Sequence, residues 1–273
     1  MRPHIVKTCL LGFCMSAPSI AAIGVNDGSF SYAQNFSSLV AAGGSSPVTS
    51  PWANDSTIAG WSLFTSSLSA PTTYRSEIGN QDIGSFTAYG NGGSSDRALG
   101  AVGLAGAYFG SPTVDATAGH IALSFMNSSG VSLDSFTVNF NGEQWRYVGS
   151  AAQTMVMTYG FGATFASVAT WTSPGAQFNW TSPLFGGLGL GGIDGNGVGQ
   201  VSGLGGAVPV SWLSNQNLWL RWTYTNTGSG GQGMGIDDVS FSVTAIPEPS
   251  STLLLLAGLA TLALFVGARR RLN

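Results

Sequence analysis

The middle of the chain, from about residue 23 to residue 245, alternates apolar and polar residues with a period of two. Clear examples lie at 120–125, 136–140 and 239–243, where β-branched or aromatic residues occupy one side of each stretch. Successive side chains of a strand point to opposite faces of a sheet, so this alternation is typical of half-buried β-strands. A convincing amphipathic helical period is missing from the same region, which indicates an all-β domain.

Clusters of Gly, Asn, Asp and Ser between these stretches predict turns at 80–82, 91–95, 127–130, 141–142 and 227–231. Frequent strands and turns over more than 200 residues predict one antiparallel two-sheet sandwich of jelly-roll type, spanning residues 23–245. Residues 186–206 hold 11 glycines and are expected to form a long loop or an ordered Gly-rich excursion. No fixed repeat is visible, which argues against a propeller or a solenoid.

The first 22 residues have the order of a secretory signal peptide. Arg2 and Lys7 precede a short apolar run at 9–15, and small residues follow at 19–22. This order predicts cleavage by signal peptidase after Ala21 or Ala22. Both cysteines of the chain precede that point, so the exported domain is expected to hold no disulfide.

Charge is scarce in the predicted domain and mostly acidic. Five of the nine basic residues lie near the termini, which leaves four arginines against eleven acidic residues between residues 27 and 238. No basic stripe remains to neutralise phosphates, so we expect no nucleic-acid partner.

The C-terminal residues 246–273 have three parts in a fixed order. Pro247-Glu248-Pro249 comes first, an apolar stretch at 253–268 follows, and Arg269, Arg270 and Arg271 come almost at the end. The apolar stretch predicts one short transmembrane helix, and the arginines place its end on the cytoplasmic side.

This order resembles the PEP-CTERM sorting signal of Gram-negative bacteria. The resemblance implies that an exosortase, a membrane Cys protease, recognises and processes the tail, in organisms that make extracellular polysaccharide. It further implies a precursor held transiently in the inner membrane, and then a protein at the cell surface or in the extracellular matrix. A permanent single-span anchor is the alternative, with the same orientation but continued membrane retention.

The body is similar, more loosely, to uncharacterised secreted bacterial surface proteins of the lectin-type or carbohydrate-binding jelly-roll kind. The segments that carry this likeness are 34–39, 52–61, 94–100, 142–146, 220–222 and 235–239. The likeness implies that the Ile-Asp-Asp-Val segment at 236–239 forms the closing strand. It brings no established catalytic residue.

Two polar and aromatic clusters are the candidate carbohydrate-binding residues: Glu143, Trp145 and Arg146 in the first, and Trp219 and Arg221 in the second. An arginine can give a carboxylate a two-pronged hydrogen bond, and a tryptophan can stack on a sugar ring. In both clusters the alternative is packing, with the tryptophan and arginine bracing neighbouring strands.

Signals for catalysis and for metal binding are weak. His120, the only histidine after residue 22, is expected at the surface or on an edge strand, and we assign no catalytic residue. Asp237 and Asp238 are candidate ligands of a structural calcium ion, because exported proteins use carboxylates for this cation. Asp194-Gly195-Asn196 is another candidate pair of oxygen ligands.

The sequence therefore predicts an exported, non-enzymatic protein that binds or organises extracellular polysaccharide. A structural biofilm or matrix protein without a specific ligand is the second hypothesis. The third is a glycan-active hydrolase, in which Glu143 would pair with one of the aspartates.

Overall fold

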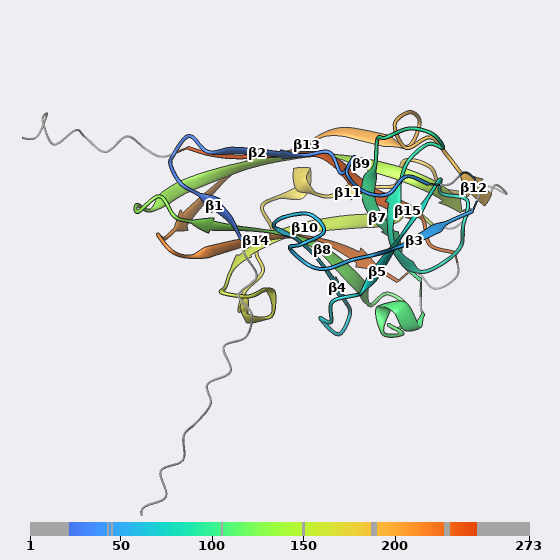
Figure 1. The fold of residues 1–273 in the computed structure, drawn as a ribbon, viewed down its shortest axis with the longest axis horizontal. Coiled ribbons are helices and arrows are strands. Elements are labelled where there is room, and N and C mark those ends of the chain that lie inside the picture. The colour runs from blue at the N-terminus through green and yellow to red at the C-terminus, as the bar shows by residue number, and fades with distance from the viewer. Residues whose placement is uncertain are drawn as a thin grey trace, which may run out of the picture.

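The structure, a computed structural model, describes residues 22–42, 44, 46–104, 106–148, 151–186, 190–226 and 230–244 (Figure 1). These residues form β-strands joined by loops and by short 3-10 turns, without an α-helix among them. The strands make two sheets that lie face to face as two layers.

The first layer, called here the β8 sheet, has the order β1-β8-β14-β10-β11, with β4 also paired to β8. Its strands are β1 (Ile23–Val25), β4 (Trp61–Thr65), β8 (Thr117–Asn127), β10 (Thr154–Phe161), β11 (Trp180–Thr181) and β14 (Asn217–Thr225).

The second layer, the β9 sheet, has the order β12-β9-β15-β7-β6-β5-β3, with β13 also paired to β9 and β2 to β15. Its strands are β2 (Ser31–Gln34), β3 (Val48–Pro51), β5 (Thr73–Glu77), β6 (Ser85–Tyr89), β7 (Ala98–Val102), β9 (Leu133–Val148), β12 (Leu190–Gly192), β13 (Gln200–Trp212) and β15 (Gly233–Val243). The 3-10 turns are η1 (Ala107–Phe109), η2 (Phe165–Ser167) and η3 (Ala176–Phe178).

From β8 to β15 the long strands alternate between the two sheets. β8, β10 and β14 belong to one sheet, and β9, β13 and β15 belong to the other. This alternation gives the sandwich its jelly-roll arrangement and confirms the predicted fold class. Two pairs depart from the antiparallel rule, since β1 runs parallel to β8 and β5 runs parallel to β6.

The main core lies between the sheets and is rich in aromatic rings. Phe125 of β8 stacks on Phe241 of β15 with 3.8 Å between ring centroids, and Trp61 stacks on Trp222 at 5.8 Å. The predicted alternating stretches supply these residues, because 120–125, 136–140 and 239–243 lie in β8, β9 and β15. Each buried ring contributes roughly 1.5–3 kcal/mol of burial free energy.

Two turn and loop predictions are wrong. Asn141 and Gly142 do not turn the chain but continue β9, because Gly142 lies under the ring of Trp180, where a Cβ would stand 2.4 Å from an indole carbon. The Gly-rich excursion predicted at 186–206 ends early, because β13 begins at Gln200 and pairs with β9.

Several predictions fall on parts of the chain outside the described residues. They are the signal peptide, except for Ala22, and the whole of residues 246–273, with the transmembrane helix predicted there. Within the described residues, no helix has the length and apolar character needed to cross a membrane.

Candidate functional site

The structure separates the two predicted carbohydrate-binding clusters. Glu143, Trp145 and Arg146 lie on β9, while Trp219 and Arg221 lie on β14 of the other sheet. The first cluster occupies the outer face of the β9 sheet, and the second occupies the outer face of the β8 sheet. The five residues therefore do not form one site.

Trp145 is fully buried, although it lies on an outer face. Its ring belongs to a small apolar cluster with Tyr89, Ala98 and Val102, and its Nε1 donates a 2.9 Å hydrogen bond to Glu143 Oε2. With 0% of its surface exposed, Trp145 offers no ring face to a sugar in this conformation. In the conformation described, Trp145 packs as the alternative interpretation expects, and its part in carbohydrate binding stays a prediction.

Small residues explain how Trp145 meets Tyr89. Tyr89 lies on β6 and Trp145 on β9, with β7 and β15 between them, so their backbones are about 14 Å apart at the usual strand spacing. The ring centroids are only 6.4 Å apart and the rings are nearly parallel, at 5°. The outward positions between them are occupied by residues without large side chains: Ala98, Gly100, Gly233 and Gly235. Both rings therefore lean into a trough over β7 and β15.

Charged side chains surround this aromatic pair. Glu77 of β5, Glu143 and Arg146 of β9 and Asp237 of β15 are each at most 5% exposed. Each has one polar atom without a hydrogen-bond partner among the described residues: Glu77 Oε2, Glu143 Oε1, Arg146 Nε and Asp237 Oδ1. We call these four residues, together with Tyr89 and Trp145, the polar cluster.

Burial shifts the titration of all three carboxyl groups. Desolvation raises the pKa of Glu77 to about 7 and that of Glu143 to about 7, although the charge of Arg146 partly opposes the first shift and the Trp145 hydrogen bond partly opposes the second. Desolvation also raises the pKa of Asp237 to about 9, and the neighbouring Glu143 and Asp238 charges add to the rise. Buried carboxyl groups with raised pKa values are typical of functional sites.

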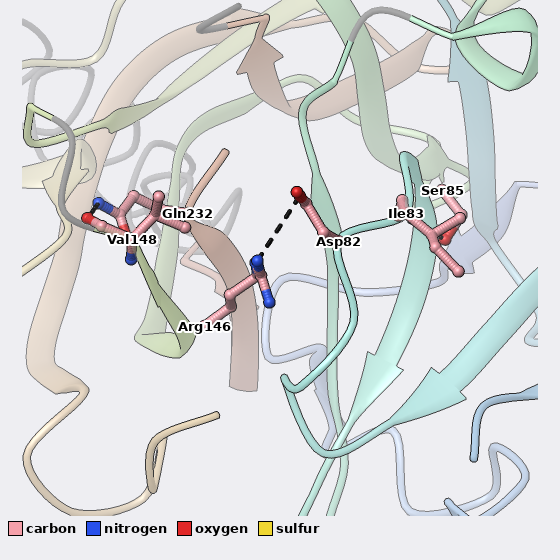
Figure 2. A network of polar contacts seen from close by, with 6 residues as sticks. All are labelled: Asp82, Ile83, Ser85, Arg146, Val148 and Gln232. Carbon is pink, nitrogen blue, oxygen red and sulfur yellow. Dashed lines mark hydrogen bonds and ion pairs between the residues drawn. The ribbon is translucent and has the colours of Figure 1, made fainter. Parts of the chain in front are cut away.

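Arg146 joins the polar cluster to a surface loop. Its guanidinium lies 3.7 Å from Asp82, whose side chain is 53% exposed, and Figure 2 shows the two groups facing one another. Gln232 accepts a hydrogen bond from Gln144 at 2.8 Å. It also donates one to the Val148 carbonyl at 2.9 Å (Figure 2). These amides fix the end of β9 from which Arg146 extends.

The predicted calcium ligands point in different directions. Asp237 is buried, whereas Asp238 is exposed, has a positive φ of 50° and accepts a hydrogen bond from Asn141 Nδ2. Among the described residues, no group of three or more His, Cys, Asp or Glu side chains is placed to hold a metal ion. The two aspartates thus do not form a complete ligand set by themselves, and calcium binding stays a prediction.

The second predicted cluster is covered by the loop at 162–172. Trp219 is 0% exposed, packs against Phe64, Phe165 and Val168, and donates a hydrogen bond to the Gly162 carbonyl. Arg221 lies over the Trp171 ring at 3.9 Å. Packing, the alternative reading of this cluster, describes both residues, so the expectation that Trp219 faces a ligand is wrong here.

His120 is also beneath this loop and not at the surface or on an edge strand as expected. It lies on the central strand β8, is 6% exposed and shares a 3.0 Å hydrogen bond with Thr223 Oγ1. Burial lowers the pKa of His120 to about 3, and the Arg221 charge adds to this.

Sequence reasoning did not identify Glu77 and Tyr89 as site residues. Both lie at the ends of short strands, and the parallel register that sets them side by side comes from β5 and β6. For Glu77 the signal was the scarcity of glutamate, since it is one of three in the chain.

Residues 245–271 match the family model described as the PEP-CTERM protein-sorting motif. The chain carries this sorting motif. The predicted resemblance is confirmed, and with it an exported, membrane-processed surface protein that an exosortase is implied to process. No curated protein matches the chain.

Two solved structures are similar to the body. The CBM22-1 xylan-binding domain of Paenibacillus barcinonensis Xyn10C has 12% identity and a TM-score of 0.34, over 76% of this chain and 99% of that one. The arabinose-bound α-L-arabinofuranosidase MgGH51 has 10% identity and a TM-score of 0.37, over 81% of this chain and 29% of that one. Similarity of this degree does not assign a ligand to the chain.

Proposed function

We propose that the exported domain binds a neutral extracellular polysaccharide at the polar cluster on the outer face of the β9 sheet, without turning it over. The observation that carries this proposal is the set of four buried charged side chains, each with a polar atom that lacks a partner among the described residues. A native protein rarely leaves such atoms without a ligand or ordered water.

The chemistry of the polar cluster suits sugar hydroxyls. A hydroxyl can donate a proton to Glu143 Oε1 or Asp237 Oδ1, and it can accept one from Arg146 Nε. The rings of Trp145 and Tyr89 are buried in the conformation described. Once uncovered, they would provide a flat apolar surface on which the C–H face of a pyranose can pack.

The charge of the cluster favours a neutral sugar over an acidic one. Glu77, Glu143 and Asp237 outnumber Arg146, and the half-buried Asp96 and the exposed Asp194 lie on the loops beside them. Above the pKa of the carboxyl groups, the carboxylates of a uronate polymer would meet like charges.

Binding can be tested by calorimetry with a soluble neutral β-glucan and mannan, and with alginate as an acidic counterpart. Glu143→Gln keeps the shape of the side chain and its acceptor for Trp145, so the fold is retained while one ligand-facing oxygen is changed. We expect the affinity to fall about tenfold, the loss of one good hydrogen bond. Asp134→Asn, at an exposed position of β9, is the matched control, and equal binding by both variants would overturn the proposal.

The sorting route has its own test. We propose that signal peptidase removes residues 1–22 and that an exosortase then processes the tail, releasing the domain from its transient place in the inner membrane. Intact mass of the released protein, from cells with and without the candidate exosortase, measures this directly. A full-length tail in both cell types would indicate the permanent anchor.

One observation favours a structural matrix protein as the second candidate. Outward residues of β2, β15, β9 and β13 form an uncharged area of small side chains next to the polar cluster: Ser31, Ala33, Thr137, Asn139, Gly205, Ala207, Ser240 and Ser242. A protein of this kind would show no saturable glycan binding, although its deletion would still alter the biofilm.

A further inference from the structure

The loop at 193–199, between β12 and β13, covers the polar cluster. A Cβ added to Gly195 would stand 2.3 Å from the Trp145 ring, so the loop backbone lies directly on the indole. A Cβ added to Gly199 would stand 2.1 Å from the Gln144 carbonyl oxygen. The loop is therefore what removes Trp145 from solvent on this side.

The loop is a compact unit held at its two ends. Inside it, Asp194 accepts hydrogen bonds from the backbone N–H groups of Asn196 and Gly199. At its ends, Ile193 N–H donates to the Trp145 carbonyl and Gln144 N–H donates to the Gly199 carbonyl, each at 2.9 Å. The two base bonds attach the loop to β9, and the bonded turn keeps the loop together, so the loop leaves β9 as one body when the base bonds break.

Among the described residues, two side-chain hydrogen bonds join the tip to the facing loop at 90–97. Asn196 Nδ2 donates to Asp96 Oδ2 at 2.6 Å, and Asn91 Nδ2 donates to Asp194 Oδ1 at 3.2 Å. Both are exposed, so each stabilises the closed position by about 1 kcal/mol.

The loop buries almost no apolar surface of its own. Its buried residues are Gly195 and Gly199, Ile193 at its base is half-buried, and Val198, its large apolar side chain at the tip, is 68% exposed. Few buried apolar contacts and exposed hydrogen bonds are the marks of a segment that opens at low free-energy cost. Ile193 and Asp194 also form one wall of an open cleft of about 410 Å³, with Ile78, Asn80, Asn91 and Gly92 opposite, which leaves the loop space on that side.

We propose that residues 193–199 are a lid, and that its opening presents Trp145 and Glu143 to a neutral glycan chain. This inference rests on the proposed function for the identity of the ligand, but the motion itself does not. Closed, the lid covers the indole face that a sugar needs. Open, it uncovers the ring and the Glu143 oxygen without disturbing the sandwich core.

Hydrogen exchange on the unliganded protein tests the motion. We expect the Ile193 and Gln144 amides, whose hydrogen bonds join the loop to β9, to exchange at least tenfold faster than the remaining amides of β9. Asn196→Ala, which removes one latch bond, should speed their exchange about fivefold further, the effect of losing about 1 kcal/mol. Asn217→Ala is the control. It removes a side-chain hydrogen bond to the Ala163 carbonyl at the other sheet, and it should leave these exchange rates unchanged. Protection of 193–199 equal to that of β9 would overturn the lid.

A lock on the lid tests its role in binding. Asp96→Cys with Asn196→Cys replaces both latch side chains by thiols on the two facing loops, and a disulfide between them holds the lid closed. Both native cysteines precede residue 22. We expect the oxidised protein to bind the β-glucan or mannan at least tenfold more weakly than the same protein after reduction. Equal binding by the two forms would overturn the gating role. If neither these forms nor the wild type bind any glycan, the proposed function fails, while hydrogen exchange still decides the motion.

Discussion

Tyr89 and Trp145 face one another across two strands that separate them, with their rings 6.4 Å apart and nearly parallel. The pair exists because the positions of β7 and β15 that lie between the two rings are Ala98, Gly100, Gly233 and Gly235. It closes the floor of the polar cluster, and Gly195 of the lid lies on its Trp145 end. Both the contact between the two rings and the contact of the lid with Trp145 thus depend on glycine or alanine.

We predict that Gly195→Ala destabilises the closed lid. The new methyl group would stand 2.3 Å from the Trp145 ring, so the loop or the indole must shift, at a cost of about 1–3 kcal/mol. Chemical denaturation measures this loss, and tryptophan fluorescence reports the greater exposure of an indole. Gly106→Ala is the control, because a Cβ there meets nothing within 4 Å among the described residues. Equal stability of the two variants would contradict the close contact.

Glu143 makes stability depend on pH. Its pKa is raised to about 7 in the folded protein, so between pH 4.5 and 7 the native state holds a proton that the unfolded state has lost. The protonated Glu143 therefore contributes its full share to the free energy of unfolding below pH 4.5. This contribution is lost as the pH rises through 7, by up to about 1.4 kcal/mol per pH unit.

Glu143→Gln removes this titration and should flatten the pH profile in that window. Urea unfolding of both proteins from pH 4 to pH 8 measures their free energies of unfolding. Over this range the free energy of unfolding of the variant should rise by about 3 kcal/mol relative to that of the wild type. The His120 effect has the opposite sign, since its depressed pKa costs stability as pH falls from 6.5 toward 3, but it is common to both proteins. A constant difference across the range would show that Glu143 is not buried as an acid.

Calcium at Asp237 and Asp238 is a third prediction. If the cation binds there, the melting temperature should be higher in 10 mM calcium than in chelator, because a ligand that binds only the folded state stabilises it. Asp237→Asn should abolish that rise. Asp115→Asn, at an exposed loop position distant in sequence from Asp237, should leave the rise unchanged. Identical melting temperatures for the wild type in both buffers would refute the prediction.

The strands could be predicted from the sequence because their pattern is local. Alternation at 120–125, 136–140 and 239–243 fixed both the element type and the face that enters the core. Asn141-Gly142 has the composition of a hairpin turn, yet it lies inside β9 because Trp180, 38 residues later, packs on the glycine. Composition alone does not distinguish these two uses of glycine.

The candidate site could be predicted only in part. Glu143, Trp145 and Arg146 do belong to the polar cluster, because a polar and aromatic run on a strand must place some of these groups together on one face. Its other members come from β5, β6 and β15, and the register that gathers them is set by strand order. Packing of Trp145 and Trp219 was the alternative interpretation of both clusters. The loops that cover them could not be predicted, because each is distant in the sequence from the strand that it covers.

Substitution of Trp219 tests whether this residue acts in packing or in glycan binding. Its ring lies within 6.5 Å of Phe64 and 5.7 Å of Phe165, on the face opposite the polar cluster. We predict that Trp219→Ala lowers stability by about 3–5 kcal/mol through the cavity that it leaves. The milder Trp219→Phe keeps the domain folded and should leave glycan affinity unchanged, whereas Trp145→Phe, a matched change at the polar cluster, should weaken it. Denaturation and calorimetry on the two phenylalanine variants measure this, and a loss of affinity in Trp219→Phe alone would move the binding site to the β8 sheet.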